Sequence, residues 1–68
     1  MANELVKVIE VLAESDKSWE DAAQQAVACA AKTLHRIKSI YIKSFEAKVE
    51  GDKILKYRIN ANISFLLD

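Results

Sequence analysis

The sequence predicts an α+β fold, a β-α-β-β chain whose three-stranded antiparallel sheet wraps around one helix. Three observations predict it: a β-branched segment at residues 4–13, a segment rich in helix formers from residue 19, and alternating segments at 39–49 and 54–66. The alternating segments flank a short turn that holds the only glycine, which is typical of a hairpin. Since the sequence shows no linker or repeat, we expect residues 1–68 to form a single domain.

The first strand is predicted at residues 4–13, ELVKVIEVLA, where valine and isoleucine are frequent. Apolar residues fall on both of its faces: Val6, Val8 and Leu12 on one, and Leu5, Ile9, Val11 and Ala13 on the other. A strand of this kind has to be covered on both faces.

The helix is predicted to begin in the motif SWED, with Ser18 as the N-cap and Asp21 completing an acidic variant of the capping box. From Trp19 to about His35, alanine and other helix formers dominate. Small side chains recur at helical spacing, which lets the helix lie close on a sheet. This stripe contains Ala23, Ala26, Val27, Ala30, Leu34 and Ile37.

The last two strands form the predicted hairpin. In residues 39–49 the alternation places Ile40 and Ile42 on one face, with Tyr41, Phe45, Ala47 and Val49 on the other. In residues 54–66 it separates an apolar row from a polar one: Tyr57, Ile59, Ala61, Ile63 and Phe65 against Lys56, Arg58, Asn60, Asn62 and Ser64. Placing the last strand in the centre makes every neighbouring pair antiparallel, and the helix becomes an ordinary right-handed crossover that covers one face.

Size and charge narrow the class of protein. A chain of 68 residues buries a small core, and its single cysteine and single histidine provide neither an internal disulfide nor a soft-metal cluster. Oligomerisation is the stabilising device that remains. Ten basic and ten acidic residues cancel without clustering, which argues against nucleic acid and membrane partners. With no signal-peptide pattern and one unpaired thiol, we expect a soluble cytoplasmic protein.

Catalytic patterns are nearly absent from the sequence, so an enzyme is the least favoured class. We interpret His35 as a cap at the end of the helix and Cys29, among alanines, as a small buried side chain. Trp19 could stack on a planar ligand, but packing against the sheet or a neighbouring subunit is the more common role of a tryptophan there.

Two groups of residues are candidates for binding. Polar and aromatic side chains on one face of the hairpin could hold a planar or anionic ligand, although a hydrogen-bond network between subunits explains them as well. This group contains Ser39, Tyr41, Lys43, Arg58 and Asn60. Carboxylates around the helix start could bind calcium, and helix capping explains them equally. They are Glu14, Asp16, Glu20 and Asp21.

Three segments of the chain resemble the dodecin family. They are KVIEVLAES at residues 7–15, AKTL at 31–34 in the capped helix, and YRINANISFLLD at 57–68. The resemblance covers essentially the whole chain. It implies a hollow homododecamer whose better-known relatives bind flavins in pairs at two-fold axes, in some cases also coenzyme A, and act in storage without catalysis.

The sequence departs from the flavin-binding members of that family at two positions. Those members carry a tryptophan near the start of the second strand, which stacks on the flavin ring, and a glutamine early in the third strand. Here these positions are Ser39, in KSIYI, and Arg58, in YRI. Loss of the aromatic platform weakens ring binding, and arginine offers only hydrogen-bond donors.

SWED together with YRI is similar to a second branch of the family, in which calcium binding is described. Three hypotheses follow from the residues and the resemblance. The first is a non-catalytic binding or storage protein with an altered flavin site, the second is a calcium-binding or other cation-binding dodecamer, and the third is a purely structural assembly.

Overall fold

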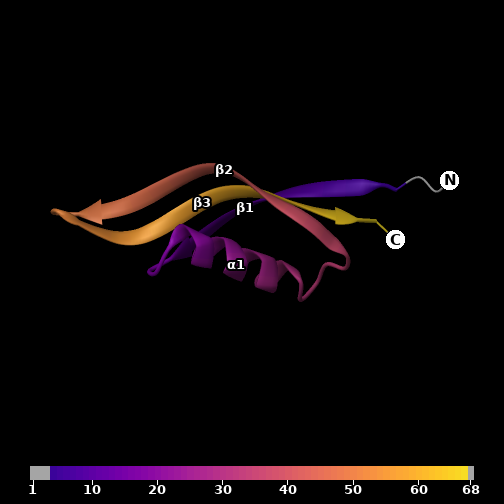
Figure 1. Cartoon of the computed structure of the whole chain (residues 1–68), viewed down its shortest axis with the longest axis horizontal. Coiled ribbons are helices and arrows are strands. Elements are labelled where there is room, and N and C mark those ends of the chain that lie inside the picture. The colour runs from indigo at the N-terminus through magenta and orange to yellow at the C-terminus, as the bar shows by residue number, and fades with distance from the viewer. Residues whose placement is uncertain (1–3, 68) are drawn as a thin grey trace.

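The computed structural model describes residues 4–67 as one helix packed on one sheet (Figure 1). The elements in chain order are β1 (Val6–Ser15), α1 (Trp19–Ala30), β2 (Ile37–Glu50) and β3 (Lys53–Leu66). The strand order is β1-β3-β2, with both neighbouring pairs antiparallel. The predicted fold class and the central position of the last strand are therefore confirmed.

The helix begins as predicted. Ser18 has extended backbone angles, and its hydroxyl accepts a hydrogen bond of 2.9 Å from the Asp21 N–H. The predicted end near His35 is wrong, because α1 ends at Ala30. The following N–H groups of Lys32 and Thr33 bond three residues back, which tightens the last turn and directs the chain toward β2. In residues 4–67 no helix has the length and apolar character needed to cross a membrane.

The first strand is displaced by two residues from its predicted position at 4–13. It begins at Val6 and includes Glu14 and Ser15, because the antiparallel register with β3 continues as far as the pair Ser15 and Tyr57. Hydrogen bonding to the partner strand, rather than the limit of the apolar run, sets where this strand ends.

The core lies between α1 and the face of β3 that was predicted to be apolar. Ala22, Ile59, Ala61 and Ile63 are fully buried, and Phe65 nearly so. Ala22, which fell outside the predicted helix stripe, is the one residue of α1 that is buried. Further side chains pack around this centre: Val11, Ala13, Trp19, Ala23, Ile40 and Ile42.

The predicted faces of the second strand are partly wrong because β2 contains a bulge. Ile42 pairs with Ala61 and Ser44 with Asn60, so Lys43 is an extra residue on one side of the ladder. Beyond this bulge, odd-numbered and even-numbered residues exchange faces. Phe45 and Ala47 therefore pair with Ile59 and Tyr57 on the helix side and share that face with Ile40 and Ile42, whereas Tyr41 pairs with Asn62 on the opposite face.

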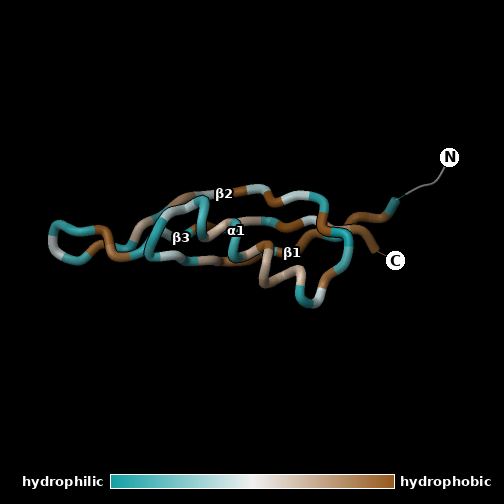
Figure 2. The backbone as a smooth tube through the Cα atoms, turned by 60° about the horizontal axis from the view of Figure 1, so that its bottom comes forward, coloured by the Kyte–Doolittle hydropathy of each residue, from teal (hydrophilic) through white to brown (hydrophobic). Residues whose placement is uncertain are grey.

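The hairpin extends beyond the rest of the fold. The pairing of β1 with β3 ends at Ser15 and Tyr57, so residues 48–56 form a two-stranded ribbon that projects past the start of α1 (Figure 1). We call these residues the hairpin arm. Its tip is hydrophilic (Figure 2), and Gly51 turns the chain there with φ of 64°, a left-handed angle that suits glycine.

Candidate functional site

The candidate ligand residues lie on the side of the sheet that faces away from α1. We call this side the polar face and define it by the central row of β3 and its cross-strand neighbours on β1 and β2. The central row is Arg58, Asn60, Asn62 and Ser64. Alternation along β3 forces this arrangement, since the residues between them are the buried core. Exposed Val8 and Leu12 of β1 and exposed Tyr41 of β2 flank the row.

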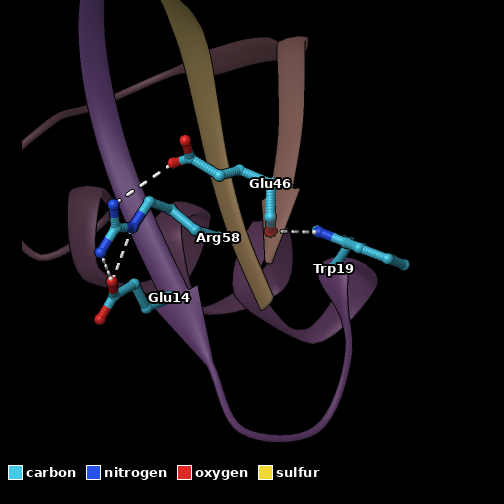
Figure 3. A network of polar contacts seen from close by, with 4 residues as sticks. All are labelled: Glu14, Trp19, Glu46 and Arg58. Atoms are coloured by element: carbon cyan, nitrogen blue, oxygen red, sulfur yellow. Dashed lines mark hydrogen bonds and ion pairs between the residues drawn. The ribbon is translucent and has the colours of Figure 1, made fainter. Parts of the chain in front are cut away.

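Arg58 is held between two carboxylates, one from each outer strand (Figure 3). The pairing register places Glu14 of β1 and Glu46 of β2 directly opposite Arg58 on either side. Arg58 donates from Nε to Glu14 Oε2 at 2.7 Å and from Nη1 to Glu46 Oε1 at 3.3 Å, and its Nη2 also pairs with Glu14. We call these three residues the Arg58 clasp.

Within the clasp, Glu14 and Arg58 favour each other's charged form. The hydrogen bond from Arg58 lowers the pKa of Glu14, and the bond to Glu14 raises the pKa of Arg58 further above its usual value. The guanidinium is therefore engaged on both sides by partners of its own chain, and a ligand that used it would have to compete with Glu14 or Glu46.

A second ion pair crosses the polar face one step farther along the sheet. Lys43, at the bulge of β2, donates from Nζ to Glu10 Oε2 of β1 at 2.8 Å, and this bond lowers the pKa of Glu10. Asn60 lies on β3 between the two outer strands. Its Oδ1 is buried and finds no hydrogen-bond partner among residues 4–67. Lys43 and Asn60 thus lie on neighbouring strands of one chain, and their part in ligand binding stays a prediction.

Ser39 and Arg58 are not brought together within one chain. Ser39 pairs with Ser64, with 2.5 Å between the two hydroxyl oxygens, whereas Arg58 lies six residues back along β3. At about 3.3 Å per residue this separation is roughly 20 Å. Tyr41 stands between them and is exposed. A small ligand therefore cannot touch Ser39 and Arg58 of the same chain at once.

The four carboxylates near the helix start do not converge. Glu14 belongs to the clasp, and Asp21 accepts hydrogen bonds of 2.6 Å from Ser15 Oγ and from Gln25 Nε2. The bond from Ser15 lowers the pKa of Asp21. Within residues 4–67, no three histidine, cysteine or acidic side chains lie close enough to share a metal ion. A cation site that used these residues would therefore take further ligands from backbone carbonyls, water or another copy.

Ser15 is a residue that the sequence did not single out. Its side chain is nearly buried, and besides donating to Asp21 it accepts from the backbone N–H of Lys17 at 2.9 Å. The hydroxyl thus ties the end of β1 to the start of α1. The motif ESDKS could have predicted this role, because a serine side chain in a turn often accepts a hydrogen bond from the backbone N–H two residues later.

Trp19 packs against the sheet, which confirms that interpretation. Its ring meets Tyr57 and Phe45 edge-on, with centroids 4.8 Å and 5.8 Å away, and its Nε1 donates to the Glu46 carbonyl at 2.9 Å (Figure 3). Two other interpretations were wrong. Cys29 is exposed on α1, although it lies two turns after the buried Ala22 on the same side of the helix. His35 lies beyond the end of the helix that it was expected to cap.

Comparison with known proteins points to one family. A family model described as dodecin matches residues 5–68. A search among curated proteins found no match.

Solved structures with a similar fold are dodecins. The dodecin of Streptomyces coelicolor is 22% identical with a TM-score of 0.93, over 100% of this chain and 97% of its own. A variant of the T. thermophilus dodecin is 24% identical with a TM-score of 0.91, over 97% and 98%. At these identities the likeness shows the fold alone.

A third structure is more similar in sequence. The calcium dodecin of Mycobacterium tuberculosis, described as a calcium-chelating immunodominant antigen with a novel calcium-binding site, is 32% identical to this chain. Its TM-score is 0.81, and the match covers 94% of this chain and 91% of that protein.

Proposed function

This chain belongs to the dodecin family, and from that membership we propose that it is a non-catalytic binding or storage protein that assembles into a hollow homododecamer. One observation carries the proposal: the sheet packs its core on the helix side and presents, on the other side, a polar face bordered by exposed apolar residues. Surfaces of this composition mark contacts with other copies or with ligands.

The ligand we propose is small and planar or anionic, with a lower affinity for flavin than typical members of the family have. Ser39 occupies the position of the stacking tryptophan. Its hydroxyl hydrogen-bonds with that of Ser64, and it has no aromatic ring on which a flavin could stack. At the position of the glutamine stands Arg58, which the clasp already engages. We propose that Tyr41, Lys43 and Asn60 provide the remaining contacts, each from two or more copies.

Native mass spectrometry of protein purified from its own source tests assembly and ligand together. We expect the mass of a dodecamer and an additional mass for any bound molecule. A monomer would contradict the proposed assembly. A yellow preparation, or strong quenching of added riboflavin fluorescence at low protein concentration, would contradict the proposed weakening of the flavin site.

A second candidate function is calcium binding, favoured by the likeness to the M. tuberculosis calcium dodecin. We propose that Glu14, Asp16, Glu20 and Asp21 would take part only where two copies meet, since one chain does not gather them. Hard cations prefer such carboxylate oxygens.

Thermal unfolding with and without calcium tests this second function. The melting temperature should rise with calcium and lose that response in an Asp16→Asn/Glu20→Gln variant. A Glu50→Gln/Asp52→Asn variant, which removes the same charge from the hairpin arm, is the control. If neither calcium nor flavin changes the melting temperature, the purely structural assembly becomes the better description.

We propose neither a nucleic acid nor a membrane partner, and coenzyme A is a further candidate for the anionic ligand of the same assembly. A cytoplasmic location also stays a prediction. Fractionation of the source cells, with the protein detected by mass, would test it, and recovery with the membrane fraction would contradict it.

A further inference from the structure

The apolar face of the sheet continues past the helix onto the hairpin arm. Along β2, Phe45, Ala47 and Val49 follow one another on that face, and Val49 pairs with Ile54 of β3. Val49 is 58% exposed and Ile54 is 50% exposed. Figure 1 shows that α1 begins near the root of the arm and does not extend over it, so these side chains have no helix above them. A two-stranded ribbon with such a strip is marginally stable alone in water.

The molecule also has a groove that is lined mainly by apolar side chains, like the exposed strip on the hairpin arm. It runs between α1 and β1 and has a volume of about 490 Å³. Its walls are mainly small or aliphatic side chains: Ile9, Val11, Ala13, Ala26, Ala30 and Leu34. The exposed Cys29 of α1 also lines it. Through this groove, apolar side chains between α1 and β1 remain accessible from outside.

The arm of one chain does not reach the groove of that chain. The groove extends along α1 to Thr33 and Leu34 beyond its end, whereas the arm projects past the start of α1 (Figure 1). The strands run continuously into the arm, with pairing up to Glu50 and Lys53. Folding the arm back would break that ladder, so the bare strip can be covered only by another molecule.

We infer that the hairpin arm of one copy docks into the groove between α1 and β1 of a second copy. This inference rests on the assembly proposed above and names the contact that builds it. Val49 and Ile54 enter the groove, while the charged tip of the arm stays in water. The contact joins two different surfaces, and such a contact builds a ring when the rotation from one copy to the next closes, which the proposed closed assembly requires.

The energy balance favours a second copy over a small ligand as the occupant. Only five apolar residues of the described chain are buried: Ala22, Ile59, Ala61, Ile63 and Phe65. A chain this small gains stability by burying further apolar surface against its copies. Docking the arm covers the bare strip and the open groove in one step, whereas a small apolar ligand in the groove would leave Val49 and Ile54 in water.

Disulfide trapping tests the contact, because Cys29 already stands in the groove. We would introduce Val49→Cys and oxidise the assembled protein. A disulfide forms only when the two Cα atoms lie within about 4.4 to 6.8 Å, so a link reports close docking. Each copy then carries one arm thiol and one groove thiol. We expect dimers and higher covalent multimers on a non-reducing gel.

Two matched variants control the trapping. Lys48→Cys places the thiol on the opposite face of the same arm and should give no multimers. Val49→Cys combined with Cys29→Ser should lose them. Dimers that persist without Cys29 would mean that two arms meet each other, and equal cross-linking through Lys48→Cys would mean random collision. Either result overturns the inference.

Native mass spectrometry of the reduced samples separates this inference from the proposed function. A dodecamer that gives no link between residues 29 and 49 overturns the docking mode and leaves the assembly standing, whereas a monomer overturns both. Ile54→Asp gives a second test that leaves the buried core unchanged. It should dissociate the particle while circular dichroism keeps its folded signature, and an intact dodecamer of this variant would overturn the inference.

Discussion

The two faces of strand β3 differ sharply in burial and in chemistry. On the helix side Ile59, Ala61 and Ile63 have no exposed surface, whereas on the other side Arg58 and Asn60 form a partly exposed polar surface. Successive residues of one strand therefore have different roles. The apolar face provides the buried core that stabilises the fold, and the polar face provides the surface that can contact ligands or other copies.

Truncation of the apolar face should give the largest effect. Ile63→Ala removes a fully buried side chain, and we expect a loss of about 2 to 5 kcal/mol in the free energy of unfolding. The matched control is Ile63→Val, which removes one methylene and should cost about 0.5 to 1.5 kcal/mol. Urea unfolding followed by circular dichroism measures both. Equal effects of the two variants would show that the residue is less tightly packed than its burial indicates.

Restoring the family's flavin-site residues should change the polar face without disturbing the core. In a Ser39→Trp/Arg58→Gln variant, we expect riboflavin affinity to rise roughly tenfold, since a stacked aromatic pair contributes about 0.5 to 1.5 kcal/mol. Quenching of riboflavin fluorescence measures the affinity.

The single variants divide the gain in flavin affinity between the two positions. Ser39→Trp supplies the stacking ring alone, and Arg58→Gln releases the clasp and supplies the amide alone. An unchanged affinity in the double variant would mean that other residues of this chain set the preference for ligand.

Removal of the helix N-cap should destabilise α1, which covers the apolar face of the sheet. Ser18→Ala removes the hydroxyl that accepts from the Asp21 N–H, and we expect a cost of about 1 kcal/mol in the free energy of unfolding. Ser64→Ala makes the same change on the polar face and should stay within about 0.5 kcal/mol. Thermal unfolding compares the two, and a larger effect of Ser64→Ala would reverse the assignment of roles to the two faces.

Local patterns predicted the apolar face correctly. The alternation in KYRINANISF separated Ile59 and Ile63 from Arg58 and Asn60 without knowledge of the fold, because a strand has a period of two. Ser18 as the N-cap was predicted on equally local grounds. Both features depend on residues within a few positions of one another.

Features that depend on register could not be predicted. The bulge at Lys43 interrupts an alternation that the sequence continues, so Phe45 and Ala47 were placed on the wrong face. The Arg58 clasp joins residues 44 and 12 positions apart, and its partners follow only from the pairing of three strands. Glu14 was therefore considered as a cation ligand and Arg58 as a ligand of an anion, although each is the other's partner.

The smallest expected effect concerns the pH dependence of stability, which reports on the polar face. The pKa values of Glu10, Glu14 and Asp21 are lowered in the folded chain, so the unfolded chain binds more protons when the medium is acidified. Their stabilising contribution is complete above the ordinary carboxylate range near pH 4 and is lost as the pH falls through the lower values of the folded state. Stability should therefore decline from about pH 5 downward.

Glu14→Gln isolates the contribution of the clasp to this decline. The variant removes the carboxylate that accepts from Arg58, so the free energy of unfolding should fall less steeply between about pH 5 and pH 2 than in the unmodified chain. Glu50→Gln removes the same charge on the hairpin arm and corrects for the change in net charge. Urea midpoints measured across this range give the slopes. If Glu14→Gln kept the original slope, the clasp would be too well solvated to couple protonation to folding, and the polar face would contribute to recognition alone.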